Sequence, residues 1–338
     1  MNSDSLSDEI ANTVKAAVKA EADKPLVVAV MGQTGVGKST LINRLFGTNL
    51  KTDPVKPCTK EVERVVVKSK DGSELWFYDM PGIGEAADVD AEYLNEYRRI
   101  LLESDIAMWA IHADMRSVSF DRWALDQIIG SDPDEGRDLL SRITVALTKV
   151  DHLAPPPWLY VKDGESGVVI PSEVLLEVIE AKQRYFFESL LAPHAEMLTA
   201  ATYNDSKWTL QLPGFKYTDD TVTYLGYLGE AEASSLAERY PEHSGLLRRL
   251  REFYSVVACS SLLRYNLTPL MISVLNKLGR GAVFRFGSQF TDDVSKLTIA
   301  EAKACLNIVV VDEGTRHPID DMGRSGNKRK HLRKGDHR

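Results

Sequence analysis

The segment GQTGVGKST at residues 32–40 constrains the fold of this chain more than any other feature. It matches the pattern GxxxxGK[S/T], which chance produces in about one chain in a hundred of this size when about 7% of residues are glycine. An apolar run typical of a buried strand precedes it at residues 26–31, and a helical pattern follows from Ser39. In this context the glycines let successive backbone N–H groups point inward and form a nest for phosphate at a helix N-terminus. The sequence therefore predicts a site for a nucleoside triphosphate.

Two side chains of this loop have distinct expected roles. Lys38 should reach the β- and γ-phosphates, and the Ser39 hydroxyl should take one coordination position of Mg²⁺. The residues that we expect to contact the nucleotide here are Gly32, Gln33, Thr34, Gly35, Val36, Gly37, Lys38, Ser39 and Thr40.

A second motif, DMPG at residues 79–82, follows a predicted strand at residues 75–78. The Asp79 carboxylate can hold Mg²⁺ through a water, and a Pro-Gly turn can move when a γ-phosphate is present. Four-letter matches are common, but this one lies two strands after the phosphate loop. We therefore place Asp79 in the metal site, and Gly82 with Lys38 in the catalytic set.

A third motif, TKVD at residues 148–151, closes the fifth predicted strand. It lies at the carboxyl edge, where open α/β sheets bind their ligands. Asp151 can accept hydrogen bonds from the N1–H and exocyclic amine of guanine, whereas adenine presents an unprotonated N1 that the carboxylate would repel. Lys149 would lay its aliphatic stem along the base. Thr148, Lys149 and Asp151 therefore predict selection of GTP and GDP, although the motif in isolation is ordinary for a strand end.

From residue 25 onward, apolar runs alternate with helical patterns. Parallel strands need crossovers, so this order predicts a mostly parallel sheet with helices on both faces, a three-layer α/β fold. The predicted strands are residues 26–31, 61–68 (at an edge), 75–78, 106–111, 143–147 and 256–259. The predicted helices are residues 39–46, 91–103, 119–129 and 267–278. Three tryptophans lie in or beside these predicted elements, and we expect their indole rings to be buried in the core: Trp76, Trp109 and Trp123.

Taken in order, the three motifs resemble the G1, G3 and G4 boxes of Era-like P-loop GTPases of the translation-factor class. The string DMPGIGE, with Pro57-Cys58-Thr59, is most similar to bacterial, often prophage-linked GTPases labelled as ribosome-binding, and immunity-related GTPases share TKxD. The resemblance covers about residues 25–151 and 255–278. It implies that Thr59 closes on Mg²⁺ and the γ-phosphate as the switch I threonine, which adds Thr59 to the metal and catalytic sets. It also implies that Ser260 and Ser261 form the G5 loop under the base.

Three positions depart from the family pattern. Thr148 stands where asparagine is commonest, so we expect a looser hydrogen bond to the phosphate loop. Ile83 stands where Ras-like members carry the glutamine that orients the attacking water, and Gly35 where potassium-activated relatives carry asparagine. Because isoleucine cannot bind water, the sequence predicts slow intrinsic hydrolysis that a partner or self-association stimulates.

The chain divides into a nucleotide-binding core and several additions. Residues 1–24 are predicted to hold an amphipathic helix, and residues 25–151 with 255–280 to form the G domain. Residues 152–254 are an insertion of helical and mixed structure, since a crossover needs only a few tens of residues. In this insertion a helix should begin at Pro171 and Ser172. A C-terminal extension (281–318) with an edge strand at 308–311 and a basic, disordered tail (319–338) follow.

The charge distribution points to partners. The whole chain carries −8, but residues 323–338 hold seven Lys/Arg and one Asp, so that this tail carries +6 and the rest −14. Such a tail can bind RNA of a ribosome or an anionic membrane surface, or it can be a solubilising segment. The three cysteines show no CxxC spacing, and we find neither a membrane span nor a secretory signal. A cytoplasmic protein, with peripheral membrane contact as an alternative, is expected.

These observations favour an Mg²⁺-dependent molecular switch that binds and hydrolyses GTP. Two alternatives stay open: a membrane-associated GTPase of the immunity-related or dynamin-like kind, and a GTP-dependent interaction module that does not hydrolyse. A small-molecule kinase would share the loop but would not need TKVD. The expected partners are guanine nucleotide, ribosome or RNA, a membrane surface, and a second copy in a GTP-dependent homodimer.

Overall fold

The computed structural model describes residues 24–51, 62–68, 74–82, 87–154, 157–198, 200–201, 211–254, 256–277, 294–303, 305 and 308–312. Four expectations lie outside these residues: the N-terminal helix, the role of Thr59, the position of Ile83 and the basic tail.

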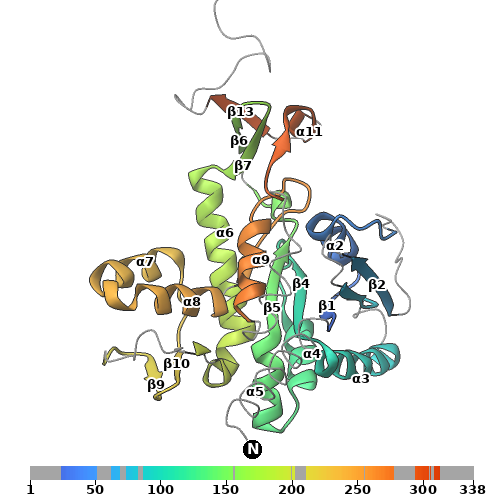
Figure 1. Ribbon diagram of the computed structural model, residues 1–338, viewed down its shortest axis with the longest axis vertical. Helices are drawn as coiled ribbons and strands as arrows, with labels where there is room; N and C mark the ends of the chain where they lie inside the picture. The colour runs from blue at the N-terminus through green and yellow to red at the C-terminus, as the bar shows by residue number, and fades with distance from the viewer. Residues whose placement is uncertain are drawn as a thin grey trace, which may run out of the picture.

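A six-stranded sheet forms the centre of the fold (Figure 1). Its order is β11-β5-β4-β1-β3-β2, and every strand runs parallel to its neighbours except β2, which is antiparallel to β3. The central strands are buried on both faces, as their continuous apolar sequences require, whereas β2 is an edge strand of half-exposed residues. The strands are β1 (Leu26–Gly32), β2 (Glu63–Lys68), β3 (Glu74–Asp79), β4 (Ile106–His112), β5 (Ile143–Thr148) and β11 (Val256–Ala258).

Helices cover both faces of this sheet and bury two separate cores, which gives the three-layer α/β fold that the sequence predicts. One face packs against α2 (Lys38–Phe46) and α9 (Leu267–Asn276). The other packs against α3 (Ala87–Glu103), α4 (Ser119–Ile129), α5 (Pro133–Arg142) and α6 (Glu173–Phe186). Ser172 caps α6 through a hydrogen bond from the Leu175 amide, so this helix begins where expected. Helix α5, which Asp132 caps and Pro133 opens, was not predicted.

A second, four-stranded sheet joins two segments that are distant in the sequence. The hairpin of β6 (Trp158–Asp163) and β7 (Ser166–Pro171) lies between the C-terminal strands β12 (Leu297–Thr298) and β13 (Ile308–Asp312), in the order β12-β7-β6-β13. The short helix α11 (Ile299–Lys303) follows β12. Figure 1 shows this sheet at the top of the view, beyond the start of α6. The predicted edge strand at 308–311 is therefore confirmed, but the hairpin was not anticipated.

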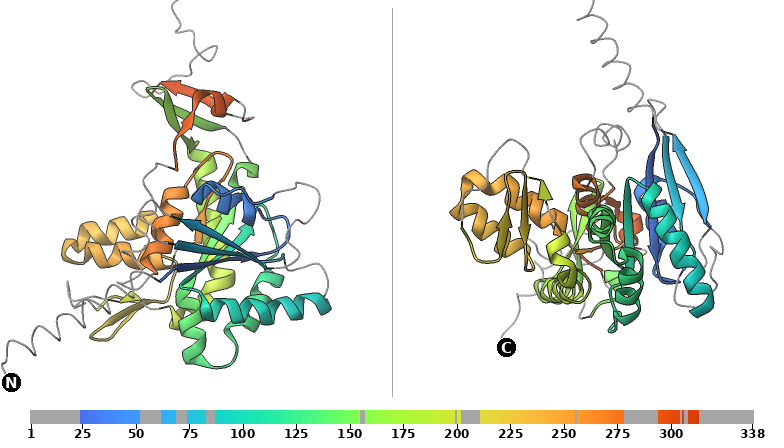
Figure 2. Two further views of the ribbon diagram at one scale, coloured as in Figure 1. Left: turned by 45° about the vertical axis from the view of Figure 1, so that its right-hand side comes forward. Right: turned by 90° about the horizontal axis from the view of Figure 1, so that it is seen from below.

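The rest of the insertion extends α6 and then folds back. A π-helical turn, η2 (Phe187–Leu191), and a 3₁₀ segment, η3 (Ala192–Met197), continue α6. A small sheet of β8 (Ala200–Ala201), β9 (Phe215–Tyr217) and β10 (Thr221–Tyr224) precedes α7 (Glu230–Arg239), η4 (Pro241–His243) and α8 (Ser244–Tyr254). Figures 1 and 2 show α7 and α8 side by side, projecting from the flank of the main sheet. No helix within the described ranges combines the length and apolar character that a membrane span requires.

Candidate nucleotide-binding site

The loop between β1 and α2 has a backbone that its glycines make accessible. Gly32, Gly35 and Gly37 have φ of +137°, +77° and +96°, a region that side chains other than glycine rarely enter. A Cβ atom on Gly32 would lie 2.1 Å from the Ala110 carbonyl oxygen of β4. The ammonium of Lys38 folds over this loop and donates to the carbonyl oxygens of Gly32 (3.1 Å) and Gln33 (3.2 Å). The loop therefore presents a buried cation and a helix N-terminus at the end of a central strand.

The side chains of Ser39 and Asp79 meet beside the loop. The Ser39 hydroxyl donates to Oδ2 of Asp79 at 2.5 Å, and Asp79 is only 1% exposed. Two adjacent hard oxygen donors fit Mg²⁺, which takes one or two protein ligands and completes its shell with water and phosphate oxygens. Among the described residues no cluster of three or more His, Cys, Asp or Glu could hold a metal by itself.

The DMPG segment lies directly against the phosphate loop. A Cβ atom on Gly82 would be 2.0 Å from Oγ1 of Thr34 and 2.6 Å from its Cα, so that only glycine permits this approach. The Met80 amide donates to the Val30 carbonyl at 3.1 Å, and the Tyr97 hydroxyl of α3 donates to the Pro81 carbonyl. The segment after β3 is thus held where a group bound to the loop would meet it.

The TKVD segment contacts the phosphate loop from the other side. The Thr148 hydroxyl lies 2.6 Å from the Val36 carbonyl and 3.1 Å from the Ile111 carbonyl. The Lys149 ammonium donates to the Gly35 carbonyl at 2.7 Å. The expectation of a loosened hydrogen bond at Thr148 is therefore wrong: β5 carries the shorter side chain close enough for a short bond.

The loop after β11 meets the end of TKVD. The Ser260 hydroxyl donates to Oδ1 of Asp151 at 2.5 Å and accepts from the Leu263 amide at 3.0 Å, and Ser260 is fully buried. Ser261 makes its contact through the backbone, since its carbonyl accepts from Nε of Arg44 in α2 at 3.0 Å. Ser260 thus reaches Asp151 through its side chain, whereas Ser261 links this loop to α2.

Comparison with known proteins identifies this arrangement. The model of the 50S ribosome-binding GTPase family matches residues 27–137. The GTPase Era of Caldanaerobacter subterraneus subsp. tengcongensis is 25% identical over 201 residues, which cover 58% of this chain and 59% of that protein. The chain contains an Era-like P-loop GTPase domain.

Other proteins resemble this GTPase domain over parts of their length. The Escherichia coli K12 protein YkfA, whose description is "uncharacterized protein", is 38% identical over 105 residues, 31% of this chain and 36% of YkfA. A crystal structure of Aquifex aeolicus Era bound to GDP and AlF₄⁻ superposes with a TM-score of 0.39 and 17% identity, over 75% of this chain and 57% of that one. The chain thus spans between about a third and three fifths of the curated relatives named here.

One residue beside the phosphate loop of the GTPase domain was not anticipated. Asp121 of α4 accepts from Nε2 of Gln33 at 2.5 Å and from Nε1 of Trp109 at 2.9 Å, and it is 1% exposed. Burial raises the pKa of this carboxyl above its ordinary value, and the two hydrogen bonds oppose that rise. A sequence signal existed, because Asp121 lies on the same helical face as the apolar Leu125 and Ile128. The carboxyl fixes the second residue of the phosphate loop to α4.

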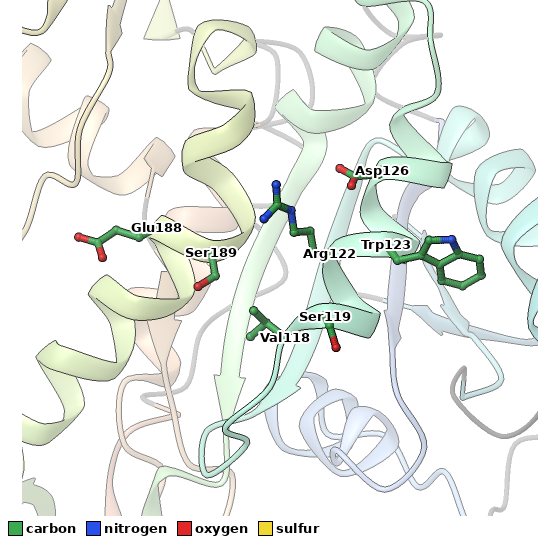
Figure 3. Close-up of a pocket in the computed structure, with 7 residues that line it drawn as sticks. All are labelled: Val118, Ser119, Arg122, Trp123, Asp126, Glu188 and Ser189. Carbon is green, nitrogen blue, oxygen red and sulfur yellow. The ribbon is translucent and has the colours of Figure 1, made fainter.

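The expectation for the tryptophans is partly wrong. Trp109 is 2% exposed and lies in the core, but Trp123 is 42% exposed. Figure 3 shows the Trp123 ring turned away from Glu188 and Ser189 of η2, toward which the neighbouring Arg122 extends. The hollow between α4 and η2 has a volume of about 540 Å³. Position 123 falls on the outer face of α4, where the ring contacts Phe120 with centroids 5.5 Å apart.

Proposed function

We propose that this chain binds GTP and GDP with Mg²⁺ and hydrolyses GTP as a molecular switch. One observation carries the proposal: three motifs and the loop after β11 meet around residues 32–40 at the carboxyl edge of the sheet. Ser39 contacts Asp79, Thr148 and Lys149 contact the phosphate loop, and Asp151 contacts Ser260. Phosphate, metal and base contacts are therefore available within one continuous site.

Each group has a role that follows from its chemistry. Lys38 and the backbone N–H groups of residues 33–38 hold the β- and γ-phosphates, and Ser39 and Asp79 hold Mg²⁺, directly or through water. When bound, Mg²⁺ supplies positive charge to the phosphate oxygens. Asp151 accepts from the N1–H and amine of guanine, and the hydrogen bond from Ser260 orients this carboxylate. By the family resemblance, Thr59 and Gly82 close on the γ-phosphate.

Hydrolysis needs a group that positions the attacking water, and Ile83 cannot supply one. We therefore propose slow intrinsic turnover that a partner or a second copy of the chain accelerates. Single-turnover hydrolysis of radiolabelled GTP tests this, measured at nanomolar and at micromolar protein. The rate constant should be low in dilute protein and rise with protein concentration or with added lysate. Rapid hydrolysis that does not change with concentration would contradict the proposed mechanism.

RNA is the partner class that we propose for this switch. The family description and the +6 charge of residues 323–338 support it. RNA binding through this tail should weaken steeply with salt, because each neutralised phosphate releases counterions. Filter binding of ribosomal RNA at 50 and 200 mM salt, beside sedimentation with anionic liposomes, separates this proposal from the membrane alternative. Retention on liposomes without retention of RNA would favour the membrane-associated GTPase.

A further inference from the structure

The loop that carries Ser260 is held by residues that lie outside the three motifs. Ser260 bonds the carboxylate that we assign to guanine. The Ser260 amide donates to the Tyr265 carbonyl at 3.1 Å, so that residues 260–265 close on themselves. The position of Ser260, and with it the orientation of Asp151, therefore depends on what fixes residues 263–266.

Arg264 ties this loop to the C-terminal segment 294–303. One guanidinium nitrogen donates to the Lys296 carbonyl, and the other donates to Oε1 of Glu301 in α11 at 2.7 Å. The second oxygen of Glu301 accepts from the Thr298 amide at 2.9 Å. Both carboxylate oxygens of Glu301 are thus hydrogen-bonded. The contact with Thr298 fixes the carboxylate against β12, and the carboxylate in turn holds the guanidinium of Arg264.

The backbone of this loop needs such support. Arg264 and Asn266 have φ of +52° and +53°, a left-handed conformation that residues other than glycine adopt only when their surroundings impose it. The Asn266 side chain supplies one restraint by donating to the Ala258 carbonyl at 3.0 Å. The hydrogen bonds from Arg264 to Lys296 and Glu301 restrain the backbone at residue 264. If those contacts are lost, the backbone around residue 264 is free to relax to an ordinary conformation.

The second sheet supports the same loop. The Trp158 ring, at the start of β6, packs edge-on against Tyr265 with centroids 5.0 Å apart. On β6, the buried Tyr160 hydroxyl donates to the Leu297 carbonyl of β12 at 2.9 Å. The hairpin after TKVD and the C-terminal segment are thus joined to each other and to the loop after β11.

We propose that Arg264 and Glu301 are positioning residues of the nucleotide site, through which the C-terminal segment 294–303 sets how long a guanine nucleotide is retained. The inference rests on the proposed binding of GTP and GDP. It assigns the C-terminal extension to the base-binding half of the site, whereas the phosphate half is built within residues 32–82. Loosening the Arg264 contact should therefore affect recognition of the base more than recognition of the phosphates.

Nucleotide dissociation from the 338-residue chain tests this. The variants are Arg264→Met and Glu301→Gln, which keep size and remove the charged contact. Fluorescent GDP is displaced by excess GDP with Mg²⁺ present. Each variant should dissociate GDP about fivefold faster, as expected for one charge-assisted contact that is partly exposed, and the double variant should be no faster than the faster single one. Unchanged rates in a protein whose wild type retains GDP would overturn the inference and leave the proposed function intact. A wild type that retains no GDP would instead overturn the proposed function.

A matched variant separates positioning from stability. Arg98 of α3 also donates to a backbone carbonyl and to a glutamate, Ile128 and Glu135, at similar exposure but away from the base site. Arg98→Met should melt as early as Arg264→Met yet release GDP at the wild-type rate. Equal acceleration in both variants would show that only stability is involved.

A base-specific comparison gives a second readout. Inosine diphosphate lacks the exocyclic amine that donates a hydrogen bond to Asp151. The wild type should therefore release it faster than GDP. Arg264→Met should reduce this difference, because the variant no longer fixes Ser260 against Asp151. Linkage is reciprocal, so bound GDP should also slow amide hydrogen exchange in residues 294–303. Proportional acceleration of both nucleotides, with exchange unaffected by GDP, would contradict the inference.

Discussion

Replacing Thr148 by valine tests the contact that joins TKVD to the phosphate loop. Valine keeps the shape of threonine and removes the hydroxyl, whose oxygen lies 2.6 Å from the Val36 carbonyl and 3.1 Å from the Ile111 carbonyl. A hydroxyl has one proton, so only one bond is lost. Thr148 is 3% exposed, and the carbonyl that loses its donor is not readily hydrated. Removing the donor and leaving a buried acceptor unpaired costs about 1–3 kcal/mol, and we expect the free energy of unfolding to fall by this amount.

The same strand offers a matched control. Thr144, four residues earlier on the same face of β5, is 1% exposed, and its hydroxyl has no hydrogen-bond partner within the described part of the chain. Thr144→Val should therefore be neutral or stabilising, because it removes a buried polar atom without breaking a bond. Urea unfolding of both variants measures the difference. The Thr148 variant should also release GDP several-fold faster, since Val36 belongs to the loop. Equal stability of the two variants, with equal nucleotide release, would refute the assigned role of Thr148.

Two further predictions concern the metal and the pH dependence. Ser39→Ala should make retention of GDP insensitive to EDTA, whereas chelation should accelerate release from the wild type; a variant that still responds to EDTA would remove Ser39 from the proposed metal site. Burial lowers the pKa of Lys277, whose ammonium donates to the Ile143 carbonyl, from 10.5 to about 7. Between these values the unfolded chain binds the proton that the folded chain has released, so folding stability should rise with pH from about 7 to 10. Lys277→Met should lack this rise by urea unfolding across that range, and identical pH profiles would contradict the lowered pKa.

The parts of this molecule that were predictable from sequence are those that local patterns specify. The β1 strand, the phosphate loop and α2 follow one another within 21 residues, and each has its own signal in periodicity or glycine spacing. The hairpin of β6 and β7 also had a signal, since Asp163-Gly164 lies between alternating apolar residues, with Gly164 at φ +61°. That signal was overlooked because residues 152–254 were predicted only as one insertion of helical and mixed structure.

Contacts between distant residues had no local signal. Ile308 of β13 pairs with Trp158 of β6, and Arg264 meets Glu301, although nothing near these residues in the sequence indicates a partner. The short hydrogen bond of Thr148 depends on how close β5 lies to the phosphate loop. The presence of threonine where asparagine is commonest does not indicate that distance. Local motifs thus indicate the groups to which we assign the proposed chemistry, but they do not indicate the contacts that hold these groups in place.

All the proposals for this protein depend on the selection of guanine by Asp151, at a site where residues 32–40 hold the phosphates. Isothermal titration of the wild type and of Asp151→Asn with GTP, ATP and xanthosine triphosphate tests it most directly. Asparagine offers a donor where the carboxylate only accepts, and xanthine carries a carbonyl where guanine has its amine. We predict that the wild type binds GTP and not ATP, and that the variant exchanges GTP for xanthosine triphosphate. Equal uptake of ATP and GTP by the wild type, or unchanged GTP affinity in the variant, would contradict the account.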